Sequence, residues 1–519
     1  MAQWDEGYVT DVAYTSNFYR ELTPGWLCLS SLLLGHRPPD TTSAFCYADL
    51  GCGNGFTSLM VAACYPQAEV WGFDFNPAHI EFANNLAAHA GLGNVHFTEA
   101  SFADIATLPD TALPDFEFII AHGVLSWISP ANRRHLMQVI TRRLKPGGLM
   151  YLSYNVAAGW ASMVPVRALM RMLTEASPER TDIAATGALD FVDRLRQASA
   201  TFFPQNPTVE ARIAEIRKQD PRYIAHEFLN QDWHPLMFAD VARDMREARC
   251  EYIGSATLSE NIDNVSVPAN VLPLLAETRD VFLRETIRDL GHAQAFRRDV
   301  YRRGISPLPP PEQQVLLENL TIAGLGQAIP DEGPSFPTPI GNVIGRPEIY
   351  QPLYEMLQHG PLSLGQAHEA PAFVNRPLVE LMQAFTMMVA GGYAHPVLPG
   401  GVTAAARETS ARLNLAIARA NGIGADLPRL AAPAIGSAIV VDVVESLLVG
   451  ELLAGGPMDA KALVGPILST LTRAGRNVQR DGKVVTDTAQ ASAILTDAIH
   501  NMIEKRVPLL RALGVVGIK

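Results

Sequence analysis

From residue 45 to residue 155, short apolar runs alternate with segments in which apolar residues recur at helical spacing. The apolar runs are CYADL (46–50), EVWGFDF (69–75), NVHFTEA (94–100), FEFIIAH (116–122) and GLMYLSYN (148–155). Helical patterns begin at Thr57, at Pro77 and near Ala131. Strands that alternate with helices in this way are typical of βαβ units on a parallel sheet. We therefore expect five strands of such a sheet by Asn155.

The helix expected from Pro77 illustrates how the local signals agree. Asn76 is suited to cap the first turn, and proline is favoured at the first helical position. Gly91 is suited to end the helix. The apolar stripe between these ends consists of Ile80, Ala83, Leu86, Ala87 and Ala90.

Residues 161–235 lose the strand pattern and contain three helical stretches that prolines separate. Beyond them, CEYIGSATL (250–258) and AQAFRRDVYRRG (293–304) would add two more strands, with a helix through 281–290 between them. The predicted fold is therefore α/β, with a Rossmann-like seven-stranded sheet. Its core would span 1–160 and 236–304, and 161–235 would form a helical insertion or regulatory region.

A proline-rich stretch, 305–341, follows the last expected strand and predicts a linker, because proline fixes φ and lacks a backbone donor. Residues 342–519 are rich in Ala and Leu and predict a mostly helical domain. Within it, GGYAHPVLPGGV (391–402) indicates a small β hairpin after a helix, a pattern compatible with a winged-helix module. The uncharged stretch 381–406 contains several glycines and prolines, so we expect a buried helix, a turn and a strand there rather than a membrane span.

Charge and composition narrow the function classes. The 519 residues include 41 basic and 53 acidic side chains, a net charge of −12, which disfavours a nucleic-acid partner. The five cysteines are scattered without CxxC spacing, so neither a disulfide framework nor a zinc site is indicated. The first residues carry no basic segment followed by an apolar run, and a cytoplasmic protein is the expectation. The oligomeric state stays open, a homodimer included.

The segment with the most chemical information is YADLGCGNG (47–55), where the first strand should turn into the first helix. Gly51, Gly53 and Gly55 allow a tight turn and a close approach of backbone to ligand. Asp49 is available to a cationic or hydrogen-bond-donating group. A dinucleotide loop would place its third glycine at Phe56, so the pattern favours an amino-acid carboxylate and ammonium over a pyrophosphate.

Two further positions indicate a nucleoside. Asp74 ends the second expected strand, 19 residues beyond Gly55, where an acidic residue can accept both ribose hydroxyls. Ser101 and Phe102 follow the third strand, where an adenine would hydrogen-bond and stack. Asp74 as a helix cap and Phe102 as a core residue are the structural alternatives.

These residues resemble the class I S-adenosylmethionine-dependent methyltransferases. That superfamily's glycine loop, acidic second-strand end and turn before the fifth strand are matched by DLGCGNG (49–55), GFDFNP (72–77) and LKPGG (144–148). The resemblance implies S-adenosyl-L-methionine as cofactor and no metal. It also implies a set of cofactor-binding residues, namely Tyr8, Tyr14, Asp49, Gly51, Gly53, Asn54, Gly55, Asp74, Phe75, Ser101, Phe102 and His122.

A narrower resemblance is carried by AHGVLSW (121–127), by SYN (153–155) with Gly159-Trp160, and by AHEFLN (225–230) with Pro235. These segments look like bacterial methyltransferases with a methyltransferase regulatory domain, among them the rickettsial protein-lysine methyltransferases. The resemblance implies methyl transfer to protein lysine. A bulky small-molecule acceptor and a non-catalytic cofactor-binding regulator remain as alternatives.

The acceptor would meet the methyl group beside the fourth and fifth strands, because doubly wound folds bind ligands at the carboxyl ends of their strands. His122, Tyr154, Asn155 and Trp127 are expected there, with Tyr14 closing from the N-terminal side. Tyr154 or His122 would take part in proton removal. His226-Glu227 lacks a second histidine at helical spacing, so no zinc site is expected.

Overall fold

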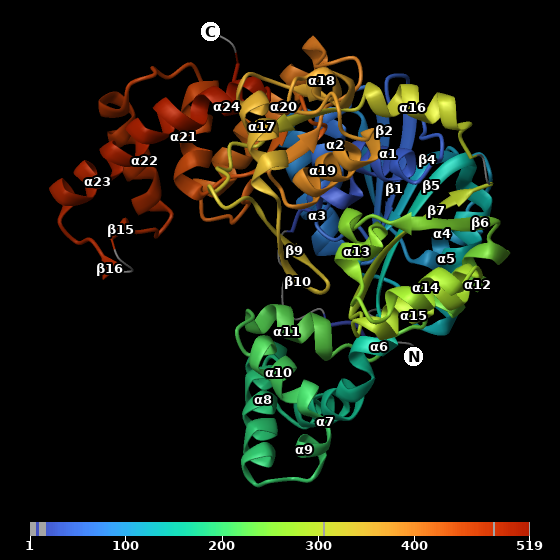
Figure 1. Ribbon diagram of the computed structural model, residues 1–519. Helices are drawn as coiled ribbons and strands as arrows, with labels where there is room; N and C mark the ends of the chain where they lie inside the picture. The colour runs from blue at the N-terminus through green and yellow to red at the C-terminus, as the bar shows by residue number, and fades with distance from the viewer. Residues whose placement is uncertain (1–6, 10–16, 305–306, 481–482, 518–519) are drawn as a thin grey trace.

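The computed structural model describes residues 7–9, 17–304, 307–480 and 483–517, and it is built around a seven-stranded sheet with strand order β3-β2-β1-β4-β5-β7-β6 (Figure 1). The strands are β1 (Phe45–Leu50), β2 (Ala68–Asp74), β3 (Val95–Glu99), β4 (Phe116–Ala121), β5 (Leu144–Asn155), β6 (Cys250–Ser255) and β7 (Phe296–Arg303). The first five pair in parallel, whereas β7 runs antiparallel to both β5 and β6. The predicted seven-stranded sheet is confirmed.

The chain changes direction across the sheet between β1 and β4. From β1 it proceeds outward to β3, and it then crosses back to place β4 on the other side of β1. The loops that follow β1 and β4 therefore diverge and leave a crevice at the carboxyl ends of the parallel strands. This crevice is where the fold can hold a ligand.

Helices cover both faces of the sheet, and each face has its own apolar core. One face packs against α1 (Pro24–Leu33), α2 (Phe56–Cys64) and α3 (Pro77–Ala90). The other face packs against α4 (Phe102–Thr107), α5 (Pro130–Arg143) and α12 (Phe238–Glu247). In α3 the predicted signals are all present, since Asn76 accepts a hydrogen bond from Ala78 N and Gly91 ends the helix at φ 60°.

The region 161–235 is helical, as expected, and projects from the rest of the molecule (Figure 1). With the turn before it, it consists of α6 (Ala157–Trp160), η2 (Ala161–Met163), α7 (Val164–Glu175), α8 (Thr181–Gln197), α9 (Phe202–Gln205), α10 (Pro207–Ile216) and α11 (Pro221–Phe228). Met170, Val192 and Ile213 belong to an apolar core of its own. The insertion is thus a separately packed unit.

The expectation of a linker at 305–341 is wrong, because about half of this segment is regular structure and parts of it are buried in the main core. It carries α16 (Pro310–Glu318), β8 (Thr321–Gly324), β9 (Ser335–Thr338) and β10 (Gly341–Ile344). Pro310 begins α16, where a missing backbone donor costs nothing. Ile322 and Phe336 are buried in the main core.

The C-terminal half is mostly helical, as expected, but its strands pair differently from the hairpin expected at 391–402. Its elements are α17 (Pro347–Gln358), β11 (Leu362–Ser363), α18 (Leu364–Glu369), α19 (Leu378–Ala390), β12 (Ala394–Pro396), α20 (Ala404–Asn421), β13 (Arg429–Ala432), β14 (Ser437–Val440), α21 (Val443–Leu453), α22 (Ala460–Arg473), β15 (Gln479–Arg480), β16 (Lys483–Val484), α23 (Thr488–Asn501) and α24 (Val507–Ala512). The strand β12 pairs with β8 in a sheet ordered β11-β8-β12. The partner of β12 thus precedes it by about 70 residues, which no local pattern reveals.

The two halves share one core. All nine residues of α2 are buried, because α20, β13 and β14 cover the side of α2 that faces away from the sheet. The hydroxyl groups of Thr409 and Ser410 in α20 donate to Ala63 O at 2.6 and 3.2 Å. Arg412 donates to Ala90 O at the end of α3 at 3.1 Å. The helices on this face of the seven-stranded sheet and the C-terminal half therefore depend on each other to bury their apolar side chains.

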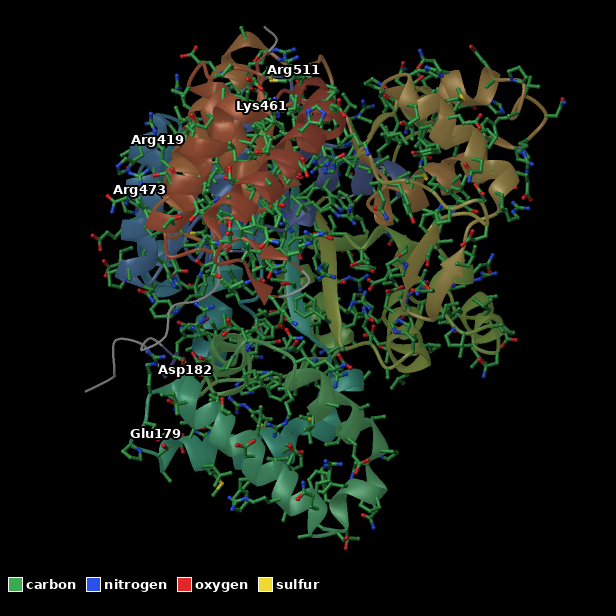
Figure 2. All side chains as sticks on the ribbon, turned by 90° about the vertical axis from the view of Figure 1, so that its left-hand side faces the viewer. Glu179, Asp182, Arg419, Lys461, Arg473 and Arg511 are labelled. Atoms are coloured by element: carbon green, nitrogen blue, oxygen red, sulfur yellow. The ribbon has the colours of Figure 1, made fainter. Side chains whose placement is uncertain are left out.

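Figure 2 shows the molecule from the side on which the C-terminal helices face the viewer, with the insertion below them. Arg419, Lys461, Arg473 and Arg511 lie on the C-terminal helices, and Glu179 and Asp182 lie on the insertion.

Among the described residues, no helix combines the length and the hydropathy that crossing a bilayer requires. The apolar segment expected as a buried helix before a strand is α19 followed by β12.

We expect a fragment ending at Gly304 to aggregate or to expose apolar surface, because it would leave one side of α2 uncovered. Coexpression of 1–304 with 307–519 as separate chains should restore a soluble complex. Size-exclusion chromatography and dye binding to apolar surface measure both outcomes. A monomeric, folded 1–304 fragment would contradict the shared core.

Candidate active site

A cavity of about 510 Å³ lies at the carboxyl ends of the parallel strands. Its walls come from the loops after β1 to β5, from the start of β7, from α11 of the insertion and from the N-terminal segment. Of the residues predicted to bind cofactor or acceptor, it is lined by Tyr8, Asp49, Gly51, Gly53, Asn54, Asp74, Phe75, Ser101, Phe102, His122, Trp127 and Asn155. Segments far apart in sequence thus converge on the predicted site.

The glycine loop turns in the conformation its sequence predicts, but its three glycines have different tasks. All three have positive φ, between 54° and 82°. A Cβ at Gly53 would meet nothing within 4 Å, so its backbone is open to a ligand, whereas a Cβ at Gly51 would collide with Val124. Gly55 does not line the cavity, because it packs against Phe97 at the start of α2. The assignment of Gly55 to the cofactor is therefore corrected to a packing role.

Asp74 connects the glycine loop to α3. Its Oδ2 accepts from Gly53 N at 2.9 Å, and its Oδ1 accepts from Asn76 N at 2.9 Å. His79 Nδ1 lies 3.1 Å from the same Oδ1, and His79 also lines the cavity. The carboxylate is only 8 % exposed. It holds the loop in shape and lines the cavity, whereas the cap of α3 is Asn76, so the alternative that Asp74 caps this helix is wrong.

Asp49 is a buried carboxylate at the end of β1. Ser58 Oγ donates to its Oδ2 at 2.8 Å, which stabilises the charged form. Burial disfavours the ionised carboxylate more strongly than this hydrogen bond favours it, and the nearby Asp74 adds repulsion. The pKa of Asp49 is therefore raised to about 7. A cationic group entering the cavity would restore the ionised form.

Ser101 and Phe102 lie at the start of α4. Ser101 forms a capping box with Asp104, whose carboxylate accepts from Ser101 N at 2.9 Å and from Ser101 Oγ at 2.6 Å. Phe102 packs partly against the core of that face and lines the cavity. The structure therefore gives Ser101 a helix-capping role in addition to its place in the wall.

The N-terminal segment is anchored to the insertion. Val9 N donates to Asn230 Oδ1 at 2.9 Å, and Gln231 N donates to Gly7 O at 2.8 Å. The ring of Tyr8 lies between Phe75 and His226, with ring centroids 5.6 Å from each. Tyr8 thus closes the cavity over the β2 end. Tyr14, expected to close it from the same side, lies outside the described residues.

His122 directly follows β4 and is neutral. Ser153 Oγ accepts from Gly123 N at 2.9 Å and lies 3.1 Å from His122 Nδ1. Tyr151 Oη is 2.9 Å from the same nitrogen. Burial and the nearby cation Arg298 lower the pKa of His122 to about 3. His122 therefore forms a wall and a hydrogen-bonding partner rather than a base at neutral pH.

Tyr154 does not line the cavity, so its expected role beside the acceptor is wrong. Its side chain is fully buried on the opposite face of β5 and donates to Asp299 Oδ2 at 2.6 Å. Asp299 also accepts from Arg297 Nε at 2.8 Å. Since side chains alternate along a strand, Ser153 and Asn155 face the site and Tyr154 faces the core.

Several cavity residues were missed by the sequence analysis. The ring of Tyr19 packs against that of His122 at a tilt of 42°, with centroids 4.0 Å apart, and Tyr223 and Glu227 enter from α11. Phe296 and Arg298 enter from β7. Trp127, which was expected, donates from Nε1 to Glu227 O at 3.3 Å. The insertion motif AHEFLN was the one available signal for α11, whereas β7 offered none.

Among the described residues, no cluster of three or more His, Cys, Asp or Glu side chains is arranged to hold a metal ion. The donors present suit an organic zwitterion with a nucleoside end. Asp49, the open Gly53 backbone and the Asp74 carboxylate all meet one cavity.

We expect Tyr154→Phe to leave cofactor affinity and turnover unchanged and to lower the free energy of unfolding by about 1–2 kcal/mol, because it removes one buried hydrogen bond to a carboxylate. Denaturant unfolding and isothermal calorimetry measure the two quantities. Tyr151→Phe serves as the contrasting variant, since Tyr151 contacts His122. A large fall in the turnover of a stably folded Tyr154→Phe protein would contradict this and indicate a role for Tyr154 in the reaction.

Two family models match the chain. A methyltransferase domain matches residues 42–190, and a predicted methyltransferase regulatory domain matches residues 220–303. The second model covers α11, β6 and β7, and therefore only the end of the region 161–235 that was expected to be regulatory.

Known proteins extend the likeness along the whole chain. The uncharacterized protein sll1526 of Synechocystis is 34 % identical over 512 residues, which cover 99 % of both chains. Trans-aconitate 2-methyltransferase of Methylobacterium radiotolerans is 30 % identical over 156 residues, 30 % of this chain and 53 % of that enzyme. PKMT2 from Rickettsia typhi, solved in complex with AdoHcy, shares the fold with a TM-score of 0.70 at 19 % identity, over 97 % of this chain and 99 % of that one.

The matched domains, the full-length relative and the shared fold agree with the glycine loop and the acidic β2 end. The protein belongs to the S-adenosylmethionine-dependent methyltransferases that carry a methyltransferase regulatory domain.

Proposed function

We propose that this methyltransferase transfers its methyl group to the side-chain amine of a protein lysine. The observation that carries the proposal is Glu227, a carboxylate of α11 in an aromatic part of the cavity wall. The rings of Tyr8, Tyr19 and Tyr223 line the same cavity as Glu227, and its charge contributes to their raised pKa values. Aromatic faces and a carboxylate together attract an ammonium group.

The cofactor would lie across the ends of β1, β2 and β3. Its methionine ammonium would face Asp49, its ribose would face Asp74 and His79, and its adenine would lie beside Ser101 and Phe102. The methyl group would then point toward the His122 side of the cavity, where Glu227 and Trp127 form the wall. Such a pose aligns the amine and the sulfonium for in-line displacement.

The acceptor must lose a proton before it attacks. A lysine ammonium has a pKa of about 10.4 in water, and desolvation lowers it. His122 is too weak a base to take this proton, because its pKa is about 3. We infer that Glu227 orients the arriving ammonium, and that burial among Trp127 and the tyrosines releases its proton to solvent.

Support for a protein acceptor comes from the full length of the likeness. PKMT2 from Rickettsia typhi matches the insertion and the C-terminal half as well as the sheet, and the rickettsial protein-lysine methyltransferases are the group that the sequence motifs resemble. A bulky small molecule is the second candidate, since trans-aconitate 2-methyltransferase matches part of this chain. Labelled S-adenosylmethionine incubated with a lysate of the source cells separates the two. We expect label in protein; label only in small molecules would refute the proposal.

We expect Glu227→Gln to lower methyl incorporation at least tenfold while changing the affinity for S-adenosylmethionine by less than about twofold, because the carboxylate acts on the acceptor. Glu210→Gln, on the exposed side of α10 in the same insertion, is the matched control and should retain full activity. Equal rates for the Glu227→Gln protein and the wild type would remove Glu227 from the mechanism.

We expect the affinity for S-adenosylmethionine to rise between pH 5 and about pH 7, by up to tenfold per unit, and then to level. The pKa of Asp49 is about 7 in the unliganded protein, and the cofactor ammonium requires its ionised form, so binding releases a proton below that pH. Calorimetry across this range measures the slope. 5′-Methylthioadenosine, which lacks the ammonium, should show no such slope, and Asp49→Asn should abolish it for the cofactor. A flat profile in the wild type would place the ammonium elsewhere.

A further inference from the structure

Arg298 lies on β7 directly opposite Ser153 of β5, and its side chain lines the cavity together with Phe296. The guanidinium lies 5.1 Å from the centre of the Phe296 ring. The Phe296 ring lies 5.9 Å from the ring of His122, which follows β4, and the His122 ring lies 4.0 Å from that of Tyr19. Arg298 therefore faces the part of the cavity between the end of β4 and the N-terminal segment, and its charge lowers the pKa of His122.

This guanidinium has few partners in the part of the chain that the structure describes. Nη1 donates to Thr257 Oγ1 at a long 3.3 Å, and Nε is buried without any hydrogen-bond acceptor. No carboxylate of the described residues lies within the 4.0 Å of an ion pair. The acids that influence it are engaged elsewhere, since Glu260 accepts from Ser255 and Gln294, and Glu21 pairs with Arg20.

Arg297, the neighbouring residue on the same strand, has a full set of charged partners. Arg297 points to the opposite face of β7 and forms ion pairs with Glu285, Asp289 and Asp299 at 2.7 to 2.9 Å. Alternation along the strand thus sends one arginine into a cluster of acids and the next into the cavity. An incompletely paired, half-buried cation is costly, and the cost is recovered when a ligand brings an anion.

We propose that Arg298 binds the methionine carboxylate of S-adenosylmethionine. The cofactor's amino-acid end is a zwitterion, and Asp49 at the end of β1 offers a partner for the ammonium only. His122, which the charge of Arg298 reaches, directly follows the strand next to β1. A guanidinium can hold a carboxylate with two parallel hydrogen bonds, a geometry that the orphaned Nε and the neighbouring Nη can supply.

The test compares two ligands that differ only in the carboxylate, S-adenosylmethionine and decarboxylated S-adenosylmethionine. We expect the wild type to prefer the former. In Arg298→Met the affinity for S-adenosylmethionine should fall about 10- to 100-fold, while that for the decarboxylated ligand changes less than about twofold, so the preference disappears. Arg298→Lys, which keeps the charge but not the fork, should retain part of the preference.

The control is Arg302→Met, an arginine of the same strand that does not line the cavity, and it should leave the preference intact. Thermal unfolding establishes that each variant is folded. If Arg298→Met is not folded, Arg298→Lys decides, because its preference should be smaller than that of the wild type. The proposal is overturned if a folded Arg298 variant keeps the wild-type preference, or if its affinity for both ligands falls equally. Arg298 would then be assigned to an anion on the acceptor. The measurement needs no acceptor, so its failure is distinguishable from failure of the lysine proposal.

Discussion

The complete burial of α2 is the constraint on which the rest of the structure depends. A helix beside a sheet ordinarily has one face in water, yet every residue of α2 is enclosed between the sheet and the C-terminal half. Its sequence, FTSLMVAAC, has no charged residue to offer to solvent. Small side chains such as Ala62 and Ala63 let α20 approach closely enough for the Thr409 hydroxyl to bond the backbone of α2. The helix is therefore stable only when both halves are present.

That burial bears directly on the site, because the glycine loop is the entry to α2. Gly55 begins the helix in a left-handed conformation, and Asp74 holds Gly53 from the neighbouring strand. The loop is thus fixed from three directions, by β2, by α3 through Asn76, and by the covered helix behind it. A loop held in this way has its shape fixed before any ligand enters, with the Gly53 backbone open to the cavity. The C-terminal half supports the loop through packing, without lining the cavity.

The sequence predicted what local patterns and strand order determine. The seven strands, the capped helix α3 and the glycine loop follow from apolar spacing and turn residues close together in the chain. One error arose because the pairing strands are distant in sequence: β8 pairs with β12 across about 70 residues. Another arose because prolines were read as a linker, whereas Pro310 begins the helix α16. Tyr154 is a different case, since strand alternation with Ser153 and Asn155 would have placed it in the core had it been applied. Arg298 could not have been distinguished from Arg297, because only the structure shows which of them meets the acids.

The two ends of the cavity have different structural origins. One end is made of strand ends and tight loops held by the main core. Under the proposed function this end would hold the cofactor, and the other end would select the acceptor. The wall that carries Glu227 and Tyr223 belongs to α11, in an insertion with its own apolar core. Substitutions on the cavity side of α11 can alter the acceptor pocket without repacking the sheet. The strand β7 contributes to both faces of the sheet, since Phe296 and Arg298 line the cavity while Arg297 and Asp299 belong to the ion-pair cluster on the opposite face.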